Sequence, residues 1–309
     1  MLQEVDHRRA FVFPGQGTQE AGMAEPLFTR NHDASILVHR TYEQANDVLG
    51  LGVDLEKLCR FGPEEELDRP EITQPAILVT SIAALRILNH YGLKPEAKTD
   101  IVAGHSLGEY SALVAAEALS FEQAVRLVRE RGKFMEAAGQ INPGGMAAIL
   151  GLERPEVEEI CRESGAQVAN INGETNITIS GSNNSVSYIV EKLGTRKARQ
   201  LRVTIASHSS LMEPARQNME LLLQQESIVA PKVPFIQNVT GNYARTVDEV
   251  RRGLVDQLTG RVLWLDSVKL MQREGVGEYI EVGAGDVLTK MIKRIDPSAL
   301  TRGWEETLR

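Results

Sequence analysis

A serine flanked by glycines is the residue of this sequence best placed to do chemistry. Ser106 stands in Gly104-His105-Ser106-Leu107-Gly108, directly after an apolar run and before a helical pattern. In that context the G-x-S-x-G pattern is typical of a nucleophile elbow, a sharp strand-to-helix turn that exposes the serine hydroxyl. The Leu107 N–H, near the start of the helix, would then help to hold an oxyanion. The alternative is an ordinary serine in a tight turn, and the position between strand and helix favours the nucleophile.

A serine nucleophile needs a base, and the sequence offers six histidines. His208 lies in the polar stretch 205–212, between a predicted strand and a predicted helix, where enzymes often place catalytic groups. His105 adjoins Ser106, so its ring should point away from the hydroxyl. The other four histidines lie in polar stretches or near a helix end: His7, His32, His39 and His90. We therefore expect His208 to be the base.

Arg131 is predicted to be a buried cation. It lies in the inward row of a helix whose N-cap is Ser120, with Gln123 completing a capping box, and the rest of that row is small or apolar. A buried guanidinium cannot lose its proton and therefore needs an anion. The helix pattern leaves two possibilities open, a structural pair with a nearby acidic residue and a bidentate clamp on a substrate carboxylate.

The loop Pro14-Gly15-Gln16-Gly17 follows the first predicted strand. Its glycines allow another group to approach the backbone closely, so the Gln16 N–H is a candidate for a second oxyanion donor. A plain turn explains the loop equally well at this point. It is not a phosphate-binding loop, because the sequence has no G-x-x-x-x-G-K-[ST] pattern.

The elements that position these loops alternate between short apolar runs and helical stretches, which predicts an α/β fold. Residues 141–204 differ, because their order of strand, helix, two strands, helix and strand is the ferredoxin-like βαββαβ pattern. We expect an α/β-hydrolase-like core with a parallel sheet, built from residues 1–140 and 205–309. Residues 141–204 would form a ferredoxin-like subdomain inserted into it.

Composition restricts the possible partners. The chain has 309 residues and a net charge of −8, which gives no reason to expect nucleic acid as a partner. Two cysteines cannot form a disulfide framework or a four-ligand zinc site. No apolar run approaches the roughly 18 residues that span a bilayer, and the first residues lack a signal peptide's apolar region. We expect a cytoplasmic, monomeric enzyme without a membrane partner, a metal or a cofactor.

Seven segments together resemble the malonyl-CoA:acyl-carrier-protein transacylases of fatty acid synthesis and the acyltransferase domains of polyketide synthases. They follow the family's order and cover nearly the whole chain: FPGQGTQ (13–19), ITQPA (72–76), GHSLGEYSAL (104–113), RGKFM (131–135), NPGGMAAI (142–149), SHSSLM (207–212) and EVGAGDVL (281–288). The resemblance implies a ping-pong reaction with a coenzyme A thioester as substrate and no cofactor. Ser106 would take the malonyl group from malonyl-CoA, with His208 as base, and pass it to the phosphopantetheine thiol of an acyl carrier protein.

The resemblance also implies roles for further residues. The N–H groups of Leu107 and Gln16 would hold the oxyanion, and Arg131 matches the arginine that grips the malonyl carboxylate. Gln74 matches a glutamine of the pocket. The main-chain carbonyl of Leu263 is the best match for the group that orients the histidine.

Some residues depart from the commoner family pattern. Ala206-Ser207 before His208 is associated with methylmalonyl units in polyketide acyltransferases, whereas Leu107 is typical of malonyl enzymes. We therefore expect malonyl and leave methylmalonyl open. The segment 172–176, NGETN, departs from the commoner Asn-x-Pro-Gly-Gln.

Two alternatives of other kinds remain at this stage. A proofreading thioester hydrolase of carrier proteins would use the same serine and histidine, but it would have little use for Arg131 as a clamp. A catalytically silent docking module would not need an intact Ser106, His208 and Gln16. The sequence does not distinguish a fatty acid pathway from a polyketide pathway.

A basic stretch near the end of the inserted segment is a candidate docking site for the acidic carrier protein. It consists of Arg196, Lys197, Arg199 and Arg202 and precedes the loop of His208, so it should lie near the mouth of the active site. Such a local patch would offset the net negative charge of the chain. A solvated run of charges is the alternative.

Overall fold

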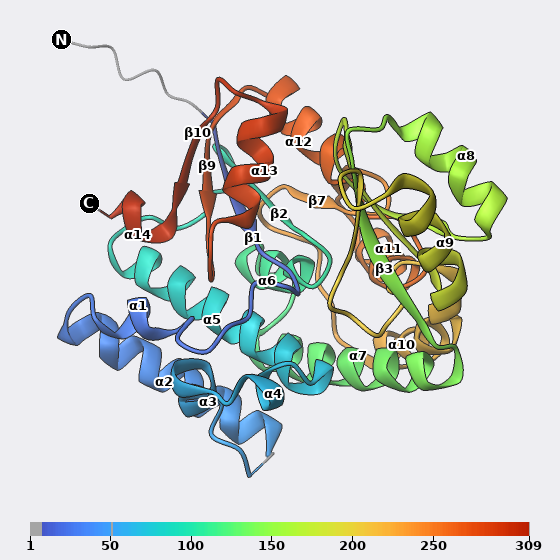
Figure 1. The fold of residues 1–309 in the computed structure, drawn as a ribbon. Helices are drawn as coiled ribbons and strands as arrows, with labels where there is room; N and C mark the ends of the chain where they lie inside the picture. Colours follow the sequence, from blue (N-terminus) through green and yellow to red (C-terminus); the bar gives the residue numbers. More distant parts are fainter. Residues whose placement is uncertain (1–7, 51, 309) are drawn as a thin grey trace.

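Six strands form the larger of two sheets in this computed structural model, which describes residues 8–50 and 52–308 (Figure 1). The strand order is β10-β9-β1-β2-β7-β8, and all neighbours pair in parallel except β7 and β8. The strands are β1 (Arg8–Phe13), β2 (Asp100–Gly104), β7 (Phe235–Gln237), β8 (Asn242–Ala244), β9 (Val276–Glu281) and β10 (Leu300–Gly303). The carboxyl ends of five strands therefore meet at one edge, where open α/β sheets place their sites.

Helices cover both faces of this sheet. Residues of β1 alternate, so that Phe11 and Phe13 join one buried cluster while Ala10 and Val12 join another. The first cluster packs under α2, α5, α6 and α7, and the second packs under α12 and α13. The helices are α1 (Glu25–Phe28), α2 (His32–Leu49), α3 (Leu55–Phe61), α4 (Glu64–Leu67), α5 (Pro70–His90), α6 (Gly108–Ala115), α7 (Phe121–Ile141), α10 (Glu213–Gln225), α11 (Val247–Asp256), α12 (Trp264–Arg273), α13 (Val287–Ile295) and α14 (Trp304–Thr307), with a 3₁₀ turn η1 (Ser210–Met212).

The smaller sheet is antiparallel and lies beside the core (Figure 1). Its strand order is β4-β5-β3-β6, and helices α8 (Arg154–Ser164) and α9 (Asn183–Leu193) complete it. The strands are β3 (Gly144–Leu150), β4 (Gln167–Gly173), β5 (Asn176–Ser182) and β6 (Ala198–Gln200). Chain order and strand order both match the βαββαβ unit, so the predicted fold class is confirmed. The division of the chain at 141 and 204 stays a prediction.

Two backbone hydrogen bonds join the smaller sheet to the core. Val262 accepts from the N–H of Ile171 over 2.9 Å, and its own N–H donates to the carbonyl of Ala169 over 2.8 Å. Val262 thereby forms an isolated parallel bridge with Asn170 of β4. This bridge joins β4 to the loop of residues 257–262, which follows α11 and contains Val262.

One sequence expectation about membranes is wrong as stated. Among the described residues, α5 is long and apolar enough to cross a bilayer by length and composition alone. However, 89% of its apolar window is buried inside the protein. Such burial is typical of a core helix, and α5 packs between α2 and α7.

Candidate active site

Ser106 sits at a sharp turn between β2 and α6. Its φ is 51°, in the left-handed region that residues other than glycine rarely adopt. A Cβ at Gly104 would lie 1.9 Å from the carbonyl carbon of Gly108, and one at Gly108 would lie 2.1 Å from the Phe13 oxygen. Only glycines fit at these two positions, so the geometry is that of a nucleophile elbow.

His208 meets Ser106 at this turn. Its Nε2 lies 2.8 Å from the Ser106 Oγ, and its Nδ1 lies 2.8 Å from the main-chain oxygen of Gln257. Because a carbonyl oxygen only accepts, the proton of the neutral ring belongs on Nδ1 and leaves Nε2 free to accept from the serine. Burial, followed by the nearby charge of Arg131, lowers the pKa of His208 to about 3. The ring is therefore neutral and able to act as a base at physiological pH.

The prediction for Leu263 is wrong. Leu263 precedes the first residue of α12, and its carbonyl accepts from the N–H and the hydroxyl of Ser267, over 3.0 and 2.9 Å. That oxygen therefore already accepts two hydrogen bonds within the first turn of α12. The carbonyl that orients His208 belongs instead to Gln257, just after the end of α11.

Arg131 is buried, with 1% of its surface exposed. It donates to Gln74 Oε1 over 2.9 Å, to Gln257 Oε1 over 2.8 Å and to Ser106 Oγ over 3.2 Å. These partners are all neutral, and no ion pair in residues 8–50 and 52–308 includes Arg131. Burial lowers its pKa from the ordinary value. Within the described residues, Arg131 therefore does not form the predicted pair with an adjacent acid. Its guanidinium faces the proposed nucleophile, Ser106.

Gln74 lies where the sequence led us to expect it. Its side chain is fully buried on α5, its Oε1 accepts from Arg131, and its Nε2 lies 3.5 Å from the sulfur of Met135 on α7. The capping box that starts α7 is also present, between Ser120 and Gln123. Arg131 thus lies on the inward face of α7, and Gln74 holds its guanidinium by accepting a hydrogen bond.

The loop after β1 packs against the elbow. A Cβ at Gly15 would lie 2.3 Å from the His105 carbonyl oxygen, so only glycine allows this approach. Gln16 is the next residue, and Leu107 begins the first turn of α6. Their N–H groups as joint oxyanion donors stay a prediction, for which the close packing of this loop is the support.

The remaining histidines lie away from the serine hydroxyl. The His105 ring lies 2.9 Å from Asn172 Oδ1 and contacts Trp264 edge to face, so it points away from Ser106 as expected. His39 pairs with Glu56 on the surface, and His32 and His90 lie at helix ends. His7 is outside the described residues. The contact with Asn172 also places segment 172–176, which departs from the commoner family pattern, next to the turn of Ser106.

Three residues at the site escaped the sequence analysis: Glu109, Asn238 and Gln257. Asn238 holds the elbow, because its Oδ1 accepts from the Ser106 N–H and its Nδ2 donates to the Gly104 carbonyl, each over 2.7 Å. Asn238 directly follows β7, and a polar residue at the carboxyl end of a strand is a usable signal. Gln257 donates to the Ser106 carbonyl over 2.9 Å, and no feature of the sequence marks it.

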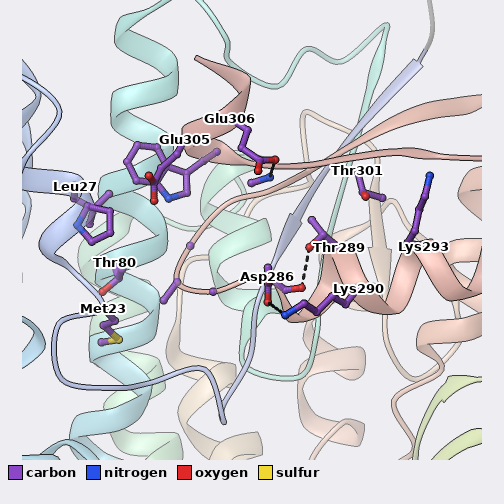
Figure 2. Close-up of a pocket in the computed structure, with 16 residues that line it drawn as sticks. Met23, Leu27, Thr80, Asp286, Thr289, Lys290, Lys293, Thr301, Glu305 and Glu306 are labelled. Atoms are coloured by element: carbon purple, nitrogen blue, oxygen red, sulfur yellow. Dashed lines mark hydrogen bonds and ion pairs between the residues drawn. The ribbon is translucent and has the colours of Figure 1, made fainter. Parts of the chain in front are cut away.

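Two cavities lie near the carboxyl edge of the larger sheet. One of about 520 Å³ lies between α8, β4 and residues 259–261 and has His208 in its wall. The other, of about 500 Å³, lies beyond β9 and β10 (Figure 2). There Lys290 pairs with Asp286, and none of the proposed site residues lines the wall. Of the proposed site residues, only His208 lines the first cavity, so neither cavity outlines the whole site. The described residues contain no cluster suited to a metal ion.

Comparison with known proteins gives a consistent result. The sequence profile described as acyl transferase domain matches residues 10–293. The malonyl CoA-acyl carrier protein transacylase of Escherichia coli K12 is 40% identical, over 93% of this chain and 92% of that protein. The polyketide biosynthesis protein ThaF of Burkholderia thailandensis is 41% identical over 93% of this chain, which spans only 24% of ThaF.

Solved structures agree with this result. The acyl-carrier-protein S-malonyltransferase of Bartonella henselae superposes with a TM-score of 0.90 at 36% identity, over 98% of each chain. A malonyl-transacylase solved in complex with its type II polyketide acyl-carrier protein gives a TM-score of 0.87 at 36% identity, over 96% of this chain and 94% of that one.

Proposed function

The chain belongs to the malonyl-CoA:acyl carrier protein transacylase family of acyl transferases, and on this premise we propose that Ser106 and His208 carry the malonyl transfer. The activity is that of an acyl-carrier-protein S-malonyltransferase, for fatty acid or polyketide synthesis. The observation that supports the two residues is the 2.8 Å contact between Ser106 Oγ and His208 Nε2, with the other ring nitrogen facing a carbonyl.

In the first half-reaction Ser106 Oγ attacks the thioester carbon of malonyl-CoA while its proton passes to Nε2 of His208. The oxyanion would lie against the N–H groups of Leu107 and Gln16. As the intermediate collapses, the carbon–sulfur bond breaks and the leaving thiolate takes the proton from His208. A strongly lowered pKa makes protonated His208 a strong acid toward that thiolate.

The second half-reaction reverses these proton transfers. The phosphopantetheine thiol of the carrier protein gives its proton to His208 and attacks the malonyl ester. The ester bond to Ser106 breaks, and the serine oxygen recovers the proton from His208. Each group returns to its starting state, as a ping-pong mechanism requires.

Arg131 would bind the malonyl carboxylate. The guanidinium lies 3.2 Å from Ser106 Oγ, so it suits an acyl group whose carboxylate is close to the reacting carbon. A buried cation with only neutral hydrogen-bond partners gains an anion when malonyl enters. This favours transfer of a malonyl group over the alternative of a general thioester hydrolase.

The finer assignments are part of the same proposal. Malonyl is the preferred unit, and Ala206-Ser207 before His208 keeps methylmalonyl as the second candidate. The enzyme would act as a cytoplasmic monomer, with the acyl carrier protein as its macromolecular partner rather than nucleic acid or a membrane. An acyl-transfer assay that compares malonyl-, methylmalonyl- and acetyl-CoA with a carrier protein tests it. Transfer of acetyl as fast as malonyl would contradict the role of Arg131.

A further inference from the structure

Glu109 is a buried carboxylate beside the site that the proposed mechanism does not use. It lies on α6 with 1% of its surface exposed. Its Oε1 accepts from the Asn238 N–H over 2.5 Å, and its Oε2 accepts from the side-chain amide of Gln257. Burial raises the pKa of Glu109, whereas the hydrogen bonds from Asn238 and Gln257 and the charge of Arg131 lower it. Both oxygens accept from N–H groups, which favours the charged carboxylate.

Gln257 connects this carboxylate to Arg131. Its Nε2 faces two groups that only accept, the Glu109 carboxylate and the Ser106 carbonyl. The amide therefore has one sensible orientation, in which Oε1 faces the Arg131 guanidinium over 2.8 Å. Glu109 and the Ser106 carbonyl together hold the Gln257 amide with its oxygen toward Arg131.

The same arrangement explains how the buried Arg131 cation is tolerated without a substrate carboxylate. Arg131 and Glu109 are of opposite charge, both are buried, and a single amide separates them. An acid in direct contact would occupy the donors that malonyl needs. An acid held one residue away compensates the charge, and the Nη2 N–H that points at Ser106 keeps a neutral partner that a substrate carboxylate can replace.

We propose that Glu109 is a positioning residue for substrate selection, which acts through the Gln257 amide to orient and neutralise Arg131. This inference rests on the proposed role of Arg131 as the malonyl clamp. The competing view is that Glu109 only stabilises the fold, through the Asn238 N–H. The two views differ in which substrates a substitution should affect.

The test compares loading of the enzyme by malonyl-CoA and by acetyl-CoA in Glu109→Gln. A glutamine at 109 removes the charge that balances Arg131, and it offers the Gln257 amide an N–H as well as an oxygen. We expect kcat/KM for malonyl-CoA relative to acetyl-CoA to fall about tenfold, in the range of couplings within one network. An equal fall for both substrates, or no fall, would overturn the proposal.

A second variant guards against a failure to fold. Gln257→Met breaks the same connection while it keeps Glu109 and the main-chain carbonyl that faces His208. It should lower the same ratio, and if Glu109→Gln shows no cooperative thermal transition, Gln257→Met alone decides. An unchanged ratio in Gln257→Met then overturns the proposal.

Two further variants separate this inference from the proposed function. Glu281→Gln is the matched control, because Glu281 is also fully buried and accepts from two N–H groups, those of Leu288 and Thr289, outside the site. It should leave the substrate ratio unchanged. Arg131→Ala must lower the ratio if the clamp is real. If it does so while Glu109→Gln and Gln257→Met do not, only the role of Glu109 fails.

Discussion

Arg131 donates a hydrogen bond to the hydroxyl oxygen of Ser106, over 3.2 Å. The cation and the proposed nucleophile therefore occupy one pocket, and any group esterified to Ser106 begins next to a guanidinium. A carboxylate on that group would replace a neutral partner with a charged one. The selectivity of the enzyme should accordingly reside in the first half-reaction, where the group is chosen.

Ser106→Ala should abolish the acyl-enzyme, because within residues 8–50 and 52–308 no other hydroxyl is placed against His208 Nε2. After incubation with malonyl-CoA, intact mass spectrometry should find one malonyl group on the wild-type chain and none on the variant. Phenylmethylsulfonyl fluoride should likewise label only the wild type. A malonylated Ser106→Ala protein would contradict the mechanism.

Arg131→Ala should shift preference from malonyl-CoA toward acetyl-CoA. Removing the clamp leaves the malonyl carboxylate without its partner, at a cost of about 2–5 kcal/mol for a desolvated charge pair. Acetyl groups lack that carboxylate and should lose much less. Arg131→Lys is the graded control, since it keeps the charge without the planar fork. Equal losses for both substrates in a loading assay would refute the clamp.

The rate of malonyl loading should stay nearly flat as the pH is lowered from about 8 to about 5. A base with a depressed pKa is neutral above that pKa and loses activity only as the pH falls toward it, here about 3. A histidine at its ordinary value of 6.5 would instead lose about thirtyfold by pH ~5. Stopped-flow loading over this range, with thermal melts to confirm folding, distinguishes the two cases.

Charge reversal at Arg196 and Lys197 should raise the KM for the carrier protein and weaken its salt dependence. Both residues are exposed, as are Arg199 and Arg202. Loading from malonyl-CoA should change little.

Lys94→Glu with Lys98→Glu is the matched control for the basic stretch. These exposed lysines precede β2 and so lie toward the opposite edge of the sheet. If both pairs of substitutions raise the KM alike, only net charge matters. If neither raises it, the basic stretch is not the docking site.

Much of the site was predictable because its members leave local signatures. Ser106 has glycines on both sides, and Arg131 interrupts an apolar row of α7. His208 stands in a polar loop, and its place was predicted from that context. In each case a few neighbouring residues carry the information.

Other parts of the site depend on contacts that no local pattern reports. Gln257 lies 151 positions from Ser106 and acts partly through its main chain, which every residue type possesses. For the same reason the choice of Leu263 failed, because the carbonyl required at that place carries no side-chain signature. Glu109 lies in a recognised motif, yet its partners come from distant segments.

The bridge at Val262 links the small sheet to the loop that holds the proposed base, His208. Val262 is fastened to β4, and the same short stretch of chain begins at Gln257, whose carbonyl determines the tautomer of His208. A tilt of the small sheet would pull on that stretch and move the carbonyl relative to the ring. A carrier protein that presses on the small sheet as it docks would therefore change the rate of proton transfer without contacting either Ser106 or His208.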